Sequence, residues 1–133
     1  MRYEASFLFL SVALLLSPSG AYAHHSFAAE YDTDKPVQIT GTVTKVEWTN
    51  PHVHFYVDVK NNKGELVNWN IELGPPLILS HLGWRQNSLK TGDQVTVEGY
   101  LAKDQSNLAN AKKVTLADGR SVFAGSSAEK RGE

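Results

Sequence analysis

The sequence predicts a small all-β barrel, and three observations support this class. Apolar and polar residues alternate with a period of two over several short segments, as they do in strands with one buried face. Clusters of Gly, Asn, Asp and Pro separate these segments and supply turns. The chain has 133 residues and no cysteine, so a single hydrophobic core, without disulfides, must stabilise it.

The first predicted strand follows Pro36 and bends near its middle. Its apolar residues occupy one face as far as Val43, after which Val46 and Trp48 hold the apolar positions. The phase of the alternation has therefore shifted by one residue. Such a shift, at residues 41–45, predicts a β-bulge that bends the strand.

The second and third predicted strands form a hairpin with the most regular alternation in the chain. Residues 52–60 and residues 67–73 both place apolar side chains at odd positions and polar side chains at even positions. The Asn50-Pro51 pair predicts a turn before this hairpin, and residues 61–64 predict its loop.

A short helix and further strands complete the predicted order. Residues 77–82 are mostly apolar and follow two prolines, which are tolerated at a helix start, and Gly83 fits a C-terminal cap. The strands that follow are predicted at residues 95–101, 108–116 and, as a short return, 121–123.

This order predicts the fold. Three meandering strands, one short helix between strands 3 and 4, and two more strands are the order of the OB-fold, a five-stranded, partly open Greek-key barrel. We therefore predict a small five-stranded OB-like barrel, with another small β-barrel or a sandwich as the alternative. A fold of this kind does not by itself identify a ligand.

The N-terminal residues predict export. Residues 7–16 form an apolar run that is too short to span a bilayer, which needs about 20 residues. The small residues at Ala21 and Ala23 fit a signal-peptidase site. Cleavage after Ala23 makes His24 the first mature residue, and cleavage after Ala21 is the alternative. The mature protein is then periplasmic or secreted, with no transmembrane segment.

The chain is thus divided into four predicted parts. They are a signal peptide over residues 1–23, an irregular N-terminal arm over 24–36, the OB-like barrel over 37–124 and a disordered tail over 125–133.

Composition and motifs exclude several function classes. The formal net charge is −1, which argues against binding a nucleic-acid backbone, since that requires concentrated Lys and Arg. The sequence has no Ser-His-Asp arrangement of any specificity, no glycine-rich phosphate loop and no His-Glu-x-x-His motif. With no catalytic constellation recognised, we predict a binding protein rather than an enzyme.

Two pairs of histidines suggest a metal site. His52 and His54 lie two residues apart on a predicted strand, so both imidazoles are on one side, and the alternation places them on the outer side. Their α-carbons are then roughly 6.5–7 Å apart, which allows both rings to approach one ion. Glu72 on the next strand faces the same way and is a secondary candidate ligand.

The second pair is at the predicted mature terminus. His24 offers its α-amine and its ring Nδ1 to one metal ion, and another imidazole completes a T-shaped set of nitrogens that suits Cu(II). His25 offers a second mode, through the amine, a deprotonated amide nitrogen and its own imidazole. Nitrogen ligands favour copper over zinc or nickel without excluding them, so copper is the predicted cofactor.

The sequence also allows other roles for the histidines and for the outer face of the sheet. The histidines can be ordinary polar residues on an exposed strand face or in a solvated terminus. His81, in the short helix, fits a capping role better than a ligand role. The rival function is a periplasmic OB module that binds a peptide, a glycan or a partner protein without metal. Its binding surface is the outer sheet face around Tyr56, Asn70, Glu72 and Tyr100.

Five groups of residues form a recognisable set of motifs along the mature chain. They are HHSFAAEYD at residues 24–32, WTNPHVH at 48–54, Asn68-Trp69 with Glu72-Leu73-Gly74, Gly83-Trp84, and KTGDQVTVEG at 90–99. Together these motifs resemble a family of small exported bacterial proteins of unknown function. The resemblance covers nearly all of the mature chain, but the family has no established activity, so it implies an exported OB-like domain.

The terminal histidine has a resemblance of its own. His24 is similar to the first residue of copper-binding exported proteins, including periplasmic copper carriers and lytic polysaccharide mono-oxygenases. The rest of the chain does not follow those families. The resemblance therefore implies a ligand role for His24 and no catalytic activity.

Overall fold

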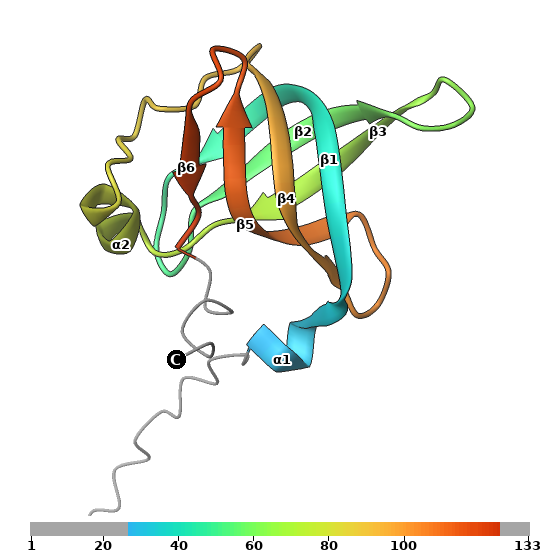
Figure 1. The fold of residues 1–133 in the computed structure, drawn as a ribbon, viewed down its shortest axis with the longest axis horizontal. Coiled ribbons are helices and arrows are strands. Elements are labelled where there is room, and N and C mark those ends of the chain that lie inside the picture. Colours follow the sequence, from blue (N-terminus) through green and yellow to red (C-terminus); the bar gives the residue numbers. More distant parts are fainter. Residues whose placement is uncertain (1–26, 126–133) are drawn as a thin grey trace, which may run out of the picture.

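The computed structural model describes residues 27–125, which form two short helices and six strands (Figure 1). Within these residues, neither helix has the length and apolar character that crossing a membrane requires. The elements are α1 (Phe27–Glu30), β1 (Tyr31–Glu47), β2 (His54–Lys60), β3 (Leu66–Glu72), α2 (Pro76–His81), β4 (Gln94–Ala102), β5 (Leu108–Leu116) and β6 (Ser121–Phe123).

The strands close into a barrel with OB topology. Their order is β3-β2-β1-β4-β5-β6, with antiparallel neighbours, and a parallel pairing of β3 with β5 closes a ring of five strands. The short strand β6 pairs antiparallel with residues 113–115 of β5. The helix α2 lies between β3 and β4 in the chain. The predicted all-β, OB-like fold with one helix between strands 3 and 4 is therefore confirmed.

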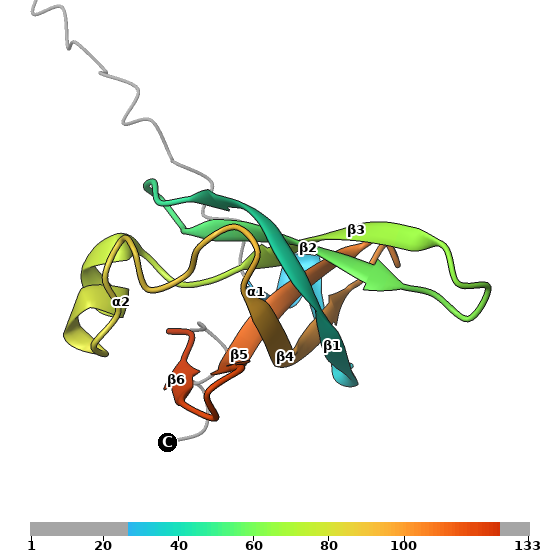
Figure 2. The ribbon, with the colours of Figure 1, turned by 90° about the horizontal axis from the view of Figure 1, so that it is seen from above.

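The long strand β1 bends so that it belongs to both sides of the barrel (Figures 1 and 2). Its first part pairs with β4 and its second part with β2, and the β2 register shifts between Val43 and Lys45. This shift is the predicted bulge. Gly41 lies just before it, where a Cβ would be 2.2 Å from the carbonyl oxygen of Asp58, so the close strand approach requires glycine.

The core consists of the apolar residues that the alternation predicts to be buried. Trp84, after α2, closes one end, and its indole nitrogen donates a 2.8 Å hydrogen bond to the Phe123 carbonyl oxygen. The largest fully buried side chains are Phe55, Ile71, Leu73, Leu79, Val43, Val53, Val57, Val97 and Val114.

The described part of the N-terminal arm is regular, so the prediction of an irregular arm over residues 24–36 is wrong there. Residues 27–30 form α1, and β1 begins at Tyr31. The cause is a second small cluster in which Phe27 and Tyr31 are buried with Ala102. The Phe27 ring lies 5.3 Å from the Tyr31 ring and 5.9 Å, edge-on, from the Tyr100 ring. These contacts fix the segment on the barrel.

The predicted signal peptide and nearly all of the predicted tail lie outside the described residues. His24 and His25 lie outside them as well.

Candidate functional site

His52 and His54 lie side by side on the outer face of the barrel, as the spacing predicts. β2 begins at His54, and backbone hydrogen bonds from Val53 to Gly74 and from Leu73 to Val53 extend the ladder past the strand end. Val53 between the two histidines is fully buried, so the flanking imidazoles point outward. Both side chains are half-buried.

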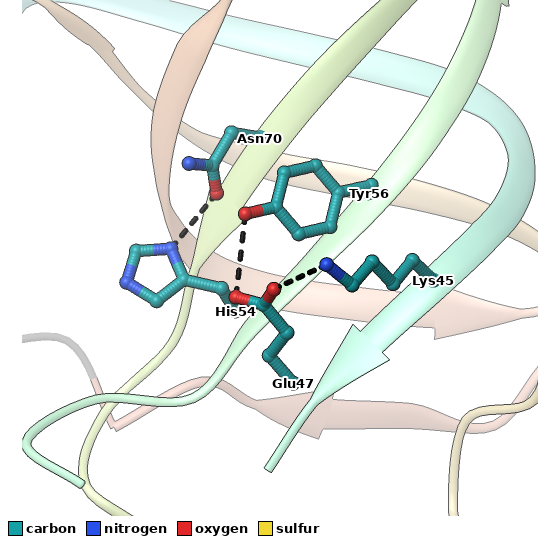
Figure 3. Close-up of polar contacts among 5 residues, drawn as sticks. All are labelled: Lys45, Glu47, His54, Tyr56 and Asn70. Carbon is teal, nitrogen blue, oxygen red and sulfur yellow. Dashed lines mark hydrogen bonds and ion pairs between the residues drawn. The ribbon is translucent and has the colours of Figure 1, made fainter. Parts of the chain in front are cut away.

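Each imidazole is held by a polar residue of β3 through its Nδ1 atom. His54 Nδ1 lies 2.8 Å from the amide oxygen of Asn70, and His52 Nδ1 lies 2.5 Å from a carboxylate oxygen of Glu72. Because both partners are acceptors, each Nδ1 donates, and in the neutral ring Nε2 then carries the lone pair. Figure 3 shows the second ring nitrogen of His54 pointing away from Asn70.

The two contacts have the same geometry relative to the strands. His54 is paired across the ladder with Glu72 but contacts Asn70, two residues away on β3. His52 contacts Glu72 with the same diagonal offset. The period of two on both strands therefore orients the two rings in the same manner.

Glu72 is a buried carboxylate whose two oxygens both have partners. Its exposed fraction is 7%, although it belongs to the outward set of β3. The Tyr31 hydroxyl donates to Oε2, and His52 occupies Oε1. Burial and the neighbouring Glu72 raise the pKa of Tyr31 well above its usual value, so the hydroxyl stays protonated and remains a donor. The N-terminal segment is thus linked to His52 through Glu72.

A second polar network lies beside His54 (Figure 3). Lys45 Nζ lies 2.5 Å from Glu47, and the Tyr56 hydroxyl donates a 3.3 Å hydrogen bond to the same carboxylate. The hydrogen bond from Lys45 lowers the pKa of Glu47 and keeps it ionised. The ammonium of Lys45 also lies 5.4 Å from the centre of the Tyr56 ring. An exposed ion pair such as Lys45–Glu47 contributes little to the free energy of unfolding. Its main effect is to make the barrel face beside His54 polar.

The described residues do not make a complete metal site on their own. Over residues 27–125, no three His, Cys, Asp or Glu side chains are grouped so as to hold an ion. His52, His54 and Glu72 lie close together, but Glu72 is already bound on both oxygens. His81 is exposed in the last turn of α2. Within the described part of the chain, His52 and His54 are therefore a pair of candidate ligands and not a complete set.

Only some residues of the surface predicted to bind a peptide, a glycan or a partner protein are accessible to such a ligand. Glu72 is buried and bonded to Tyr31, whereas Tyr100 is half-buried with its ring edge-on to that of Phe27. Tyr56 and Asn70 are half-buried on the outer face. The surface for a peptide or glycan is therefore smaller than the sequence suggests.

Comparison with known proteins identifies a family. A model of a family of unknown function, DUF6152, matches residues 13–111. The chain belongs to this family. The matched region contains all five histidines and extends into the predicted signal peptide. No curated protein matches the chain.

Among solved structures, the chain is similar to the mitochondrial single-stranded DNA binding protein Rim1 of S. cerevisiae. The two are 15% identical, with a TM-score of 0.49, over 62% of this chain and 93% of that one. The assignment of the OB-fold rests on the strand order and the β3–β5 closure described above, and not on this similarity.

Sequence reasoning missed the role of Tyr31. It is separated by 41 residues from Glu72, and the contact depends on a β1–β4 pairing that the sequence does not specify. The available signal was an aromatic residue in a polar segment. An isolated aromatic residue of this kind indicates a packing site.

We expect Tyr31→Phe to lower the free energy of unfolding by about 1–3 kcal/mol, because the buried Glu72 carboxylate loses a donor. Tyr56→Phe is the matched control, since its hydroxyl makes a longer bond at the half-exposed surface. Urea unfolding of both variants measures the difference. Equal losses in the two variants would show that the Tyr31–Glu72 hydrogen bond contributes no more to the free energy of unfolding than the Tyr56–Glu47 hydrogen bond.

Proposed function

We propose that the protein is an exported metal-binding protein that prefers Cu(II) and acts as a carrier or buffer rather than as an enzyme. The observation that carries this proposal is the orientation of two neighbouring imidazoles. His52 and His54 both use Nδ1 for a hydrogen bond to β3, which leaves both Nε2 lone pairs for an ion. Histidine ligands of metals are commonly held in this way by a carboxylate or carbonyl group.

The roles of the β3 residues follow from these contacts. Asn70 and Glu72 orient His54 and His52 and increase the basicity of the rings. Glu72 was a candidate ligand on sequence grounds. With both oxygens engaged, it supports the site better as an orienting residue than as a ligand.

The remaining ligands in this proposal are the α-amine and the imidazole of His24, with His25 as a secondary candidate. His24 is three residues before Phe27, and three peptide units span at most about 11 Å. Phe27 packs on Tyr31, Tyr31 binds Glu72, and Glu72 binds His52. This continuous set of contacts links Phe27 to His52, and the short separation of His24 from Phe27 in the sequence supports convergence of the two ligand pairs.

The donor set determines the preferred metal. One amine and three imidazoles supply nitrogen ligands only, and such a set favours Cu(II) with its tetragonal geometry. The chain has no cysteine, so thiolate ligands are excluded. Copper is therefore the proposed metal, ahead of zinc and nickel.

The test is a Cu(II) titration of the mature protein that begins at His24, in competition with a chromophoric chelator. The matched control carries one additional alanine before His24, which removes the chelate formed by the terminal amine and the adjacent ring. We expect the extension to weaken binding at least about tenfold, as the loss of an outer-sphere partner alone costs about 10- to 100-fold. Equal affinities would remove His24 from the site.

A second variant tests the orienting role. Asn70→Ala should weaken Cu(II) binding by about 10- to 100-fold, because His54 loses the acceptor that fixes its ring. Asn68→Ala is the matched control, since Asn68 lies on the same strand but bonds to Asp58 and Thr44. If both alanine variants bind Cu(II) as the unmodified protein does, the Asn70 contact has no part in metal binding.

Protons should compete with the metal for the same nitrogens. Ligation requires neutral imidazole, so Cu(II) affinity should fall as the pH decreases from about 8 to about 5, across the usual titration range of histidine. Titrations at several pH values measure this slope. An affinity that does not change over that range would argue against a histidine ligand set.

The alternative function, a metal-free periplasmic module for a peptide, glycan or partner protein, has less support. Glu72 is buried, which leaves Tyr56, Asn70 and Tyr100 as its half-buried surface. Under this alternative, replacing His52 and His54 would change partner binding only modestly.

A further inference from the structure

A groove lies between the loop that follows α2 and the β5–β6 hairpin, on elements that do not contribute to the proposed metal site. Its volume is about 690 Å³, far more than an inorganic ion needs. In Figure 1 both segments lie on the side of the barrel next to β6. The polar side chains that line the groove are Arg85, Asn87, Ser88, Lys90, Asp93, Arg120 and Ser121.

The groove concentrates positive charge in a chain whose net charge is −1. Arg85 and Arg120, the two arginines of the described residues, both line it, and Lys90 adds a third cation. Asp93 is the only carboxylate among the described lining residues, and it accepts a 2.9 Å hydrogen bond from the backbone N–H of Lys90. The lining side chains therefore carry an excess of two positive charges, one of which, on Arg120, is paired with Asp118 beside the groove.

Arg120 is held in position by a neighbouring carboxylate. Its Nε lies 2.6 Å from Asp118, which also accepts a hydrogen bond from the Arg120 backbone N–H. These two bonds lower the pKa of Asp118 and keep it ionised. Because Asp118 binds Nε, the two terminal nitrogens of the guanidinium are left to form a fork for a second carboxylate.

The groove also has an apolar component. Leu116 and Val122 line it and are half-buried, while Asn87 and Ser121 add an amide and a hydroxyl. Arginine forks match carboxylates, and apolar side chains suit a short hydrocarbon segment between two acidic groups. From this combination we propose that the groove binds a small organic dicarboxylate, with Arg85 and Arg120 as the residues that bind its acidic groups.

The test is an NMR titration of the metal-free mature chain with succinate, glutarate and inorganic phosphate. We expect saturable shifts at residues 83–93 and 116–122 with the dicarboxylates, and weaker binding of phosphate. Arg85→Gln and Arg120→Gln should each weaken dicarboxylate binding by about tenfold, the usual effect of losing a charged hydrogen bond. Both side chains are exposed, so the spectra should retain the folded pattern.

Lys63→Gln is the control with the same change of charge, since Lys63 is exposed in the β2–β3 loop. It should leave dicarboxylate binding unchanged. Three outcomes would overturn the proposal. They are shifts that do not saturate, an equal loss in the Lys63 variant, and phosphate binding as tight as that of either dicarboxylate.

Discussion

Replacing both His52 and His54 with alanine is expected to weaken Cu(II) binding to the mature protein at least about 100-fold. Loss of one orienting partner typically lowers metal affinity about 10- to 100-fold, and loss of two ligands should lower it more. Both side chains point away from the core, so the variant should remain folded. A competition titration with the mature terminus intact measures the change.

His81→Ala is the control for this double variant. His81 is exposed on α2 and makes no contact with β2 or β3 that the described structure records. Its replacement should leave Cu(II) affinity unchanged. A double variant that still binds as tightly as the His81 variant would exclude the strand histidines from the site.

Phe55→Ala is expected to lower the free energy of unfolding by about 3–5 kcal/mol, the usual cost of truncating a buried phenylalanine. Phe55 is fully buried in β2 next to His54, where it is paired with Val46 of β1 and Ile71 of β3. A domain of this size is stabilised by only about 5–15 kcal/mol, so the loss is a large fraction of the total. Urea unfolding measures it.

Phe123→Ala removes the same ring from an exposed position on β6, where the side chain is 59% exposed. It should cost less than about 1 kcal/mol, since little apolar area returns to water. Similar losses in the two phenylalanine variants would contradict the described core.

The period-two alternation predicted most of the barrel because each strand has one buried face. Residues 108–116 match β5, and the phase shift near Thr44 marks the observed bulge. Strand ends were less certain, since β2 begins at His54 and His52 continues the ladder only through the backbone bonds of Val53. Periodicity identifies faces well, but it does not define where pairing stops.

The candidate site was predictable in part for the same reason. Alternation placed His52, His54, Asn70 and Glu72 on one face, and the structure brings them into contact. The pairing of each histidine with its own β3 partner depends on register, which a single sequence does not specify.

The N-terminal segment shows where local reasoning fails. Residues 27–31, Phe-Ala-Ala-Glu-Tyr, are too few to show a periodic pattern that marks them as structured. Their order comes from packing against Ala102 and Tyr100, which are about 70 residues later in the chain. Tertiary contacts of this kind override the local pattern, and they also bury Glu72.

The ligands of the proposed metal site are identified by pulsed electron paramagnetic resonance of the Cu(II)-loaded mature protein with ¹⁵N-labelled histidine. The spectrum counts the imidazoles on the metal and shows whether the terminal amine is also bound. We expect three imidazoles, from His24, His52 and His54, together with the amine. A spectrum with a single imidazole, unchanged when His52 and His54 are replaced, would contradict it.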